Sequence, residues 1–414
     1  MKRKGIVGVV AASALAISAA LVPSAHAAPK TILVWADNVR GPQLKTILDG
    51  NTTIAPGYKI SVKFYSALDA LQSAWDKATA AGGPDIMTGP ASFATQGAAS
   101  GKIVSLPFGA IVKSQIPAAA ISAMSYKGKA YGMPTDLDTT AFVTNNNLYG
   151  AGSPATLKEA IAWYNANKTA KGLTGGFCAV DGTWGSQGVI TALGGGAWKT
   201  KGSSIDASST LFNSTSFKNN IKTYLLDSSG KSNGFFQWDG CGDAFKAGKI
   251  PFAITGAWNY DGFTKAGVKF TLSSVPGLNG GNGQQWVNYS GAYVTSFAKE
   301  HGVALGAQKV VMNYLGSVAG QVAMYKASKR PPANTLAISS VTDPLTLGVT
   351  QAGSTGMAQI SPLLDDKAGG TNWYDTLSAA YTDIFVKGKD VSTTLDAAAA
   401  IINKNFKEDR KSVV

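Results

Sequence analysis

The sequence predicts an α/β fold organised in two domains. Short apolar or alternating runs take turns with segments of helical periodicity along the whole chain. This order implies sheets covered by helices. The 414 residues also exceed what one hydrophobic core usually organises, which favours two domains. No internal repeat of about 20–50 residues is visible, and its absence argues against a solenoid.

The first elements follow from periodicity. The apolar run Thr31–Ala36 predicts a buried strand, and Lys59–Tyr65 alternates in the way of a strand with one buried face. Between them, Gln43–Leu48 is interpreted as a helix. These three elements set the strand–helix–strand order of the N-terminal region.

Later segments continue the pattern. A helix is expected over Leu68–Ala81, stopped by the Gly-Gly-Pro sequence that ends at Pro84, and a strand begins at Asp85. The longest periodic segment runs from about Gly306 to Lys326 and predicts the longest helix.

The segment Ala253–Phe263 carries the strongest local signal. A short apolar run ends in Gly256, and Trp258 and Tyr260 follow at once. A buried strand that ends by presenting aromatic rings beside a glycine can build a stacking platform at the mouth of a cleft. Core packing of Trp258 is the alternative, because tryptophan buries well anywhere.

The N-terminus indicates export. A basic start at Lys2–Lys4 precedes the apolar, small-residue stretch Gly5–Val22, and Ala25-His-Ala27 fits a cleavage site. We expect a signal peptide cleaved after Ala27 and a periplasmic, extracellular or cell-surface protein. No cysteine stands where a lipoprotein signal requires one. A transmembrane helix is disfavoured, because no later run reaches the roughly 18 apolar residues of a membrane span.

The chain is basic, with a formal net charge of +13. About +10 remains without the signal peptide, because that segment carries three cations. No run of five or more Lys or Arg occurs, so a solvated basic surface is favoured over nucleic-acid binding. A weak attraction to anionic cell-envelope polymers stays open.

The reactive side chains are few. Cys178 and Cys241 indicate one disulfide in an exported chain, with two buried thiols as the alternative. Two cysteines and two histidines leave too few ligands for zinc, and no cofactor motif occurs. His301, the only histidine beyond Ala27, is interpreted as part of a surface turn. No GxSxG elbow accompanies it, so a serine or cysteine hydrolase is disfavoured.

Five blocks, in order, carry a resemblance to a known family. They are Ile32–Trp35, Gly83–Ile86, the Tyr126–Pro134 hairpin, Phe245–Trp258 and Ala307–Ala333. Together they resemble the extracellular sugar-binding proteins of bacterial ABC importers, the maltose/maltodextrin-binding protein family (solute-binding protein family 1). The resemblance covers essentially the whole chain after the signal peptide.

The resemblance implies a type II periplasmic-binding-protein fold: two α/β lobes, each a mixed sheet flanked by helices, joined by hinge crossovers. The N-terminal lobe would comprise residues 28–137 plus 292–337, and the C-terminal lobe residues 138–291 plus 338–414. It further implies a monomeric, non-enzymatic receptor that holds an oligosaccharide between the lobes. The membrane permease of an ABC transporter would be its partner.

Family binding residues map onto this chain one by one, as aromatic rings that stack on a sugar or as polar groups that bind its hydroxyls. Aromatic positions match Trp258, Trp373, Tyr374 and Trp184. An acidic sugar contact falls near Asp181, and a crossover carboxylate falls on Asp138. Polar and basic contacts after the first strand match Asp37 and Arg40. Trp286 and Tyr289 are further cleft candidates.

One departure bears on the ligand. Maltodextrin binders resemble one another in an Asp-Arg pair after the third strand, and Ser92 and Phe93 stand there in this chain. Phe93 is therefore a further candidate binding residue. The loss of the charged pair disfavours maltose and favours a longer maltooligosaccharide or a related α-glucan.

Two other functions are weighed. Asp136 and Asp138 share one face of a predicted strand, roughly 6–7 Å apart, which is near the spacing of glycosidase carboxylates. A secreted glycosidase is disfavoured, since one such pair at a hinge is no catalytic signature. An importer receptor for iron, a polyamine or a phosphonate is the other alternative.

Overall fold

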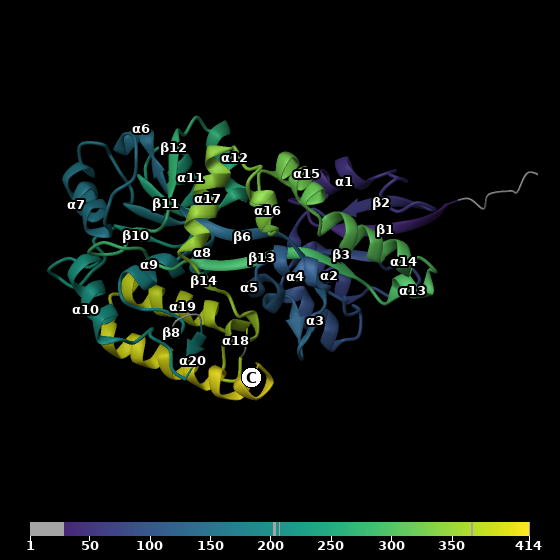
Figure 1. Ribbon diagram of the computed structural model, residues 1–414. Helices are drawn as coiled ribbons and strands as arrows, with labels where there is room; N and C mark the ends of the chain where they lie inside the picture. Colours follow the sequence, from purple (N-terminus) through teal and green to yellow (C-terminus); the bar gives the residue numbers. More distant parts are fainter. Residues whose placement is uncertain (1–28, 202–203, 207, 366, 414) are drawn as a thin grey trace, which may run out of the picture.

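The computed structural model describes residues 29–414 except 202–203, 207, 366 and 414. Its helices surround one long mixed sheet that runs through the molecule (Figure 1). The predicted α/β fold is thereby confirmed. The expected signal peptide lies outside the described residues. No helix in the described part of the chain is long and apolar enough to cross a membrane.

Ten strands form the main sheet, in the order β10-β7-β11-β6-β13-β3-β1-β2, with β12 beside β6 and β14 beside β13. Their bounds are β1 Lys30–Ala36, β2 Tyr58–Phe64, β3 Ile86–Pro90, β6 Gly132–Asn145, β7 Phe177–Ala179, β10 Phe236–Gln237, β11 Phe252–Gly256, β12 Phe270–Ser273, β13 Trp286–Val294 and β14 Met357–Ala358. Two small hairpins stand apart: β4 Ser125–Tyr126 with β5 Lys129–Ala130, and β8 Lys199–Lys201 with β9 Ser204–Asp206.

The helices fall in two groups along the chain. Those before the second half are α1 Gly41–Leu48, α2 Leu68–Asp76, α3 Ser92–Ala99, α4 Ala110–Gln115, α5 Ala118–Ala123, α6 Asn146–Tyr149, α7 Leu157–Asn167, α8 Gly182–Gly185 and α9 Gln187–Ala192. The remainder are α10 Thr215–Tyr224, α11 Gly242–Lys246, α12 Ala257–Lys265, α13 Phe297–Glu300, α14 Ala304–Gln308, α15 Val318–Ser328, α16 Thr335–Ile338, α17 Pro344–Ser354, α18 Ser361–Asp365, α19 Trp373–Tyr381 and α20 Val391–Val413, with π-helical turns η1 Lys309–Leu315 and η2 Thr382–Val386.

Two long strands connect the two ends of the sheet. The first part of β6 pairs with β13 as far as Thr139, and from Thr140 onward β6 pairs with β11. The register of β6 against β13 shifts between Ser290 and Gly291, as at a β-bulge. Figure 1 shows β6 and β13 crossing the middle of the molecule. The chain is therefore continuous across the centre through paired backbone rather than through loops alone.

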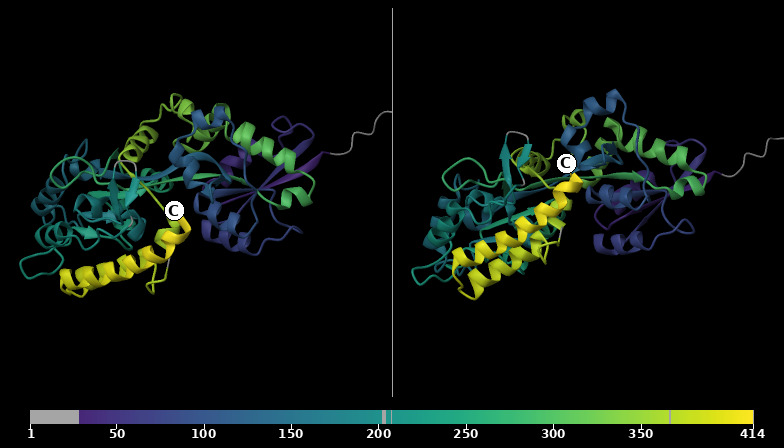
Figure 2. Two further views of the ribbon diagram at one scale, coloured as in Figure 1. Left: turned by 60° about the horizontal axis from the view of Figure 1, so that its bottom comes forward. Right: turned by 90° about the horizontal axis from the view of Figure 1, so that it is seen from below.

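The buried apolar residues separate by sequence into two regions. Two clusters contain residues from 32–133 and 289–324 only, and we call these the N-terminal core. Two others contain residues from 142–286 and 349–406 only, and we call these the C-terminal core. Figure 2 shows α20 lying along the C-terminal side, where Leu395 and Ile402 are fully buried. Each end of the sheet thus has a hydrophobic interior of its own.

Most predicted elements are confirmed, with one clear error. The predicted strand at Thr31–Ala36 is β1, and the predicted helix at Leu68–Ala81 is present but ends at Asp76. The predicted single helix over 306–326 is wrong. It breaks at Gly316, after which Ser317 takes an extended backbone and caps α15 with its side chain. The longest helix of the described residues is instead α20, of 23 residues.

A disulfide joins β7 to the segment before α11. Cys178 and Cys241 are bonded, with their Cα atoms 5.7 Å apart and 63 residues between them in sequence. Both belong to the C-terminal core. The bond therefore fastens two neighbouring elements of one core and does not link the two ends of the sheet.

His301 is exposed at the turn after α13, and its ring holds a buried carboxylate. Nδ1 lies 2.7 Å from Oδ1 of Asp85, and Nε2 lies 2.5 Å from the carbonyl oxygen of Ala80. Asp85 is 1% exposed and also accepts the backbone N–H of Leu33. The hydrogen bond to Ala80 and the Asp85 carboxylate raise the pKa of His301, against a smaller opposing effect of burial. Both ring nitrogens face acceptors, so the protonated ring fits best.

We expect His301→Gln to destabilise the protein in a pH-dependent way. Because the folded-state pKa is raised, the stabilisation is fully present below the unfolded pKa of about 6.5 and is lost as the pH rises through the folded value. Melting temperatures of both proteins should therefore differ more at about pH 6 than at about pH 9. A difference that grows toward alkaline pH would contradict this role.

Candidate functional site

The strand β11 delivers Trp258 to the centre of the molecule. β11 is buried along its whole length and ends at Gly256, and α12 begins with the next residue. The indole ring of Trp258 folds back over Gly256 so closely that a Cβ atom there would lie 2.2 Å from ring carbons. Gly256 therefore provides the space in which the half-buried Trp258 ring lies.

Asp181, in the turn after β7, fixes the orientation of that ring. The indole Nε1–H of Trp258 donates to Oδ1 of Asp181 at 2.8 Å, and the hydroxyl of Thr255 donates to Oδ2 at 2.6 Å. The amide of Asn259 adds a longer bond of 3.3 Å. Burial raises the pKa of Asp181, and these hydrogen bonds partly offset that rise. The carboxylate thus acts as an acceptor that positions Trp258.

A second set of aromatic side chains continues from Trp258. The Trp184 ring lies 5.7 Å from the Trp258 ring, centroid to centroid, in a tilted arrangement. Gln359 accepts a hydrogen bond from Nε1 of Trp184 and donates one to the hydroxyl of Tyr374, each at 3.1 Å. Residues far apart in sequence therefore form one line of half-buried rings and amides within the C-terminal part.

A cluster of opposite charges lies where β1, β6, β13 and α15 meet. Arg40 donates to Asp37 at 2.6 Å, to Asp138 at 2.9 Å and to the hydroxyl of Ser290. Asp138 also accepts a bond from Ser290, at 2.9 Å. From the other side, Nη1 of Arg330 lies 3.1 Å from oxygens of both Asp136 and Asp138. Five charged side chains thus form one ion-pair network.

Burial makes this network strongly coupled. The side chains of Asp37, Asp136, Arg40 and Arg330 are at most 7% exposed. Burial opposes ionisation of Asp138, but the guanidinium groups of Arg330 and Arg40 outweigh it and hold the pKa of Asp138 below its usual value. The three carboxylates in turn raise the pKa of Arg40, against the effect of its burial. All members therefore stay charged at neutral pH.

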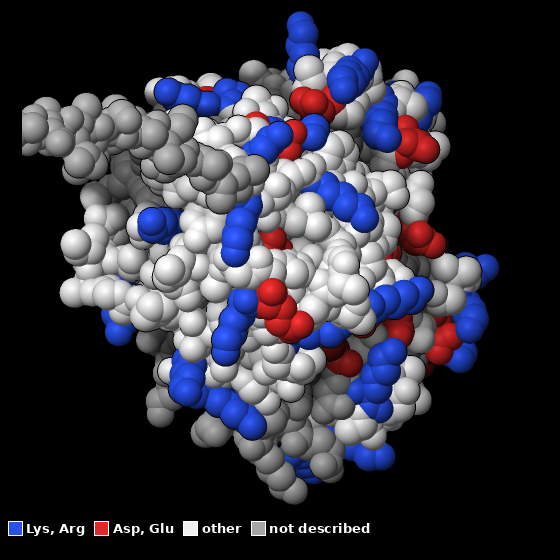
Figure 3. Space-filling model, turned by 90° about the vertical axis from the view of Figure 1, so that its right-hand side faces the viewer, with Lys and Arg blue, Asp and Glu red and all other residues white. Residues whose placement is uncertain are grey.

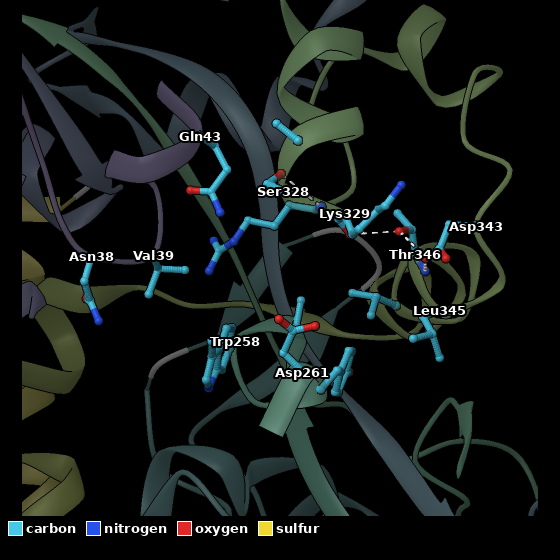
Figure 4. A pocket seen from close by; sticks show the side chains of 15 residues that line it. Asn38, Val39, Gln43, Trp258, Asp261, Ser328, Lys329, Asp343, Leu345 and Thr346 are labelled. Atoms are coloured by element: carbon cyan, nitrogen blue, oxygen red, sulfur yellow. Dashed lines mark hydrogen bonds between the residues drawn. The ribbon is translucent and has the colours of Figure 1, made fainter. Parts of the chain in front are cut away.

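Arg330 connects this network to Trp258, because its guanidinium carbon lies 5.9 Å from the centre of the indole ring. Beside them is a cavity of about 400 Å³. Figure 4 shows Asn38, Val39 and Gln43 on one side of the cavity, Asp343, Leu345 and Thr346 on the other, and Trp258 and Asp261 below. The walls come from the approach to α1, from α12, from the end of α15 and from the start of α17. Its volume lies in the range of small-ligand pockets.

The structure brings most of the candidate residues together in these two networks. Asp37, Arg40 and Asp138 meet in the ion-pair network, and Trp258, Asp181, Trp184 and Tyr374 meet through hydrogen bonds and ring contacts. Two candidates lie elsewhere. Trp373 is 1% exposed in the C-terminal core against Phe212. Phe93 is 3% exposed and packs on Tyr293 in the N-terminal core.

Three participants escaped the sequence analysis. Arg330 was interpreted only as part of a basic helix end, and Gln359 and Gln43 were not singled out. Arg330 lies 194 residues from Asp136, so no local pattern links them. Oε1 of Gln43 is buried beside the cavity and has no hydrogen-bond partner among the described residues.

The comparisons place these features in a family. The model of the bacterial extracellular solute-binding proteins matches residues 53–346. The chain belongs to this family. The matched region contains Trp258, Asp181, Asp138 and Arg330, and thus the ion-pair network apart from its two members before residue 53.

This solute-binding protein also has a curated relative. A galactooligosaccharide-binding protein of Bacillus subtilis (strain 168) is 27% identical to it over 264 residues. The match spans 61% of this chain and 60% of the length of that relative.

Proposed function

We propose that this protein is the substrate-binding component of a carbohydrate ABC transporter. It captures an oligosaccharide in the cavity beside Trp258 and delivers it to a membrane permease. The protein acts as an exported receptor without catalysis. Family membership supports the binding role, and the name of the curated relative supports a sugar ligand.

The observation that carries the proposal is the placement of Trp258. Its ring is half-buried, held by Asp181, and lines a cavity with residues from both sides of the molecule. A pyranose has apolar C–H faces and a polar rim, so an indole face covers one and side-chain oxygens and amides bind the other. Asn38, Gln43 and Asp261 supply polar groups around the ring, and the unpaired Oε1 of Gln43 fits a sugar hydroxyl as donor.

The two cores are proposed as lobes that close on the ligand, with the boundaries given above, and β6 and β13 as part of the hinge. The cavity walls support this division. Asn38 and Gln43 adjoin the N-terminal core, whereas Trp258 and Val349 adjoin the C-terminal core. A ligand that contacts both walls stabilises the closed arrangement over the open one.

The sugar is proposed in two classes. The resemblance to maltodextrin binders favours an α-glucan of three or more units, whereas the relative's name points to galactooligosaccharides. Both classes offer apolar pyranose faces to Trp258 and hydroxyls to the surrounding polar groups. They differ in the axial or equatorial hydroxyl at one ring carbon, which a site of fixed hydrogen-bond groups discriminates.

The ion-pair network argues against a glycosidase. A glycosidase needs one carboxyl group with a raised pKa as proton donor. Asp136 and Asp138 are instead both bound by Arg330, and the pKa of Asp138 is lowered. Neither carboxylate is free to act as an acid.

A thermal-shift screen tests the proposal. The exported protein would be heated with maltose, longer α-glucans and galactooligosaccharides, because a ligand that binds only the native state raises the melting temperature. We expect a rise with one oligosaccharide series and little change with maltose. No rise with any sugar, together with a rise on adding iron, a polyamine or a phosphonate, would support the non-sugar receptor instead.

Gly256→Ala should weaken sugar binding although it adds only one methyl group. The new Cβ would collide with the Trp258 ring, so the ring must leave its position and its hydrogen bond to Asp181. The backbone of Gly256 has φ −103°, which alanine adopts without strain. Calorimetric titration should show the loss. Gly262→Ala on the same helix is the control, since its nearest neighbour is an ordinary contact at 3.9 Å and affinity should stay unchanged.

A further inference from the structure

The exposed charge of this protein is concentrated on the part that surrounds the N-terminal core. In residues 29–137 and 292–337, all of which the structure describes, thirteen lysines run from Lys30 to Lys329, and twelve of them are exposed. The exposed acidic residues there are four: Asp49, Asp69, Asp76 and Glu300. The other acids of these segments are buried in ion pairs or hydrogen bonds. Figure 3, which faces this end of the molecule, shows lysines spread over it.

The chemistry of these cations indicates an extended anionic partner. Both arginines of these segments are buried in the ion-pair network, so the surface presents only lysines. A lysine is a flexible point charge, whereas specific recognition of one phosphate favours the planar fork of arginine. Dispersed lysines therefore suit a surface of many negative charges better than one bound anion.

One hollow on this part combines lysines with apolar side chains. It measures about 570 Å³ and includes Phe108, Lys113, Lys129 and Gln308 in its lining. Beside it, Ile111 of α4 and Leu305 of α14 are 72% and 70% exposed, among the most exposed large apolar side chains described. Among the residues that line the hollow, none is acidic.

We propose that this lysine-rich part docks on the surface of a membrane that contains anionic phospholipids, with the hollow between α4 and α14 as its centre. Lysines lie against headgroup phosphates, and Ile111 and Leu305 enter the interface between headgroups and acyl chains. Charge complementarity together with two adjacent exposed apolar residues favours a bilayer over a soluble polyanion, which offers no apolar layer. The docking is independent of the sugar that the cavity holds.

Vesicle co-flotation tests this docking. The exported protein is mixed with vesicles of phosphatidylcholine alone or with added phosphatidylglycerol. We expect it to float only with the anionic vesicles, and less at high salt, which screens the charges. Binding to a soluble poly(glycerol phosphate) but not to anionic vesicles would overturn the bilayer assignment, and so would the absence of any binding.

Matched variants locate the surface. The triple variant Lys113→Gln, Lys129→Gln, Lys309→Gln should lower the partition coefficient about 100-fold, at about fivefold per lysine. Lys231→Gln, Lys249→Gln, Lys269→Gln removes the same charge from exposed positions of the C-terminal part and should change it little. Equal losses would mean that net charge alone acts, which contradicts the proposal.

Two further readouts complete the test. Ile111→Gln combined with Leu305→Gln should weaken the binding that persists at high salt, and an unchanged residual would contradict apolar insertion. Sugar titration of the same variants should be unaffected. This separates failure of membrane docking from failure of the proposed sugar binding.

Discussion

Trp258→Ala is expected to lower oligosaccharide affinity by about 50- to 100-fold. The estimate follows from about 100 Å² of sugar face that the indole ring covers, at about 25 cal/mol per Å², or about 2.5 kcal/mol. The carboxylate of Asp181 also loses the Trp258 N–H that it accepts. Calorimetric titration of both proteins with the same oligosaccharide measures the loss. Trp258→Phe keeps a ring and should lie between the two.

The control for this prediction is another half-buried tryptophan of the same part. Trp163 packs against Tyr149 and Phe252 and does not line the cavity. Trp163→Ala should lower the melting temperature without changing affinity. If Trp258→Ala behaves in the same way, Trp258 is core packing and the proposed site is wrong.

Arg330→Met should destabilise the protein by about 3–5 kcal/mol, the usual cost of removing one partner from a buried ion pair. Arg330 is the cation that binds Asp136 and Asp138 together, and its removal leaves Asp136 with only a distant Arg40 nitrogen at 3.9 Å. Chemical denaturation measures the change in the free energy of unfolding. Lys326→Met removes an exposed cation of the same helix and should cost less than about 0.5 kcal/mol.

The destabilisation should depend on pH in a defined direction. Because the folded pKa of Asp138 is lowered, its ionisation contributes stability above the unfolded pKa of about 3.9, and this is lost as the pH falls through the folded value. The difference between the two proteins should therefore shrink below about pH 4. A difference that is constant from neutral to acidic pH would point to lost packing of the Arg330 side chain instead.

The elements that could be predicted are those whose signal is local. β1 and β2 follow from their own apolar patterns, and β11 with Gly256 and Trp258 follows from one short segment. The helix over 306–326 failed because its apolar stripe continues across Gly316 and Ser317, where the backbone turns away. Gly320 lies so close to Tyr314 that a side chain there would collide with the Tyr314 carbonyl, a contact that no periodicity reveals.

The candidate site divides in the same way. Trp258 and Asp138 could be named because each stands next to a recognisable strand end or crossover. The sequence could not show that Arg330 neutralises Asp138, because their contact joins positions 192 residues apart. Nor could residue type tell a stacking ring from a core ring: Trp258 is half-buried at the cavity, whereas Trp373 lies inside the C-terminal core.

The most direct measurement is a calorimetric titration of the exported protein with galactooligosaccharides and with α-glucans of increasing length, repeated with Trp258→Ala. The account predicts micromolar binding to at least one series, near −8 kcal/mol, and loss of most of that affinity in the variant. Heat from neither series, or equal affinity with and without the indole ring, would contradict the assignment of this cavity as the sugar site.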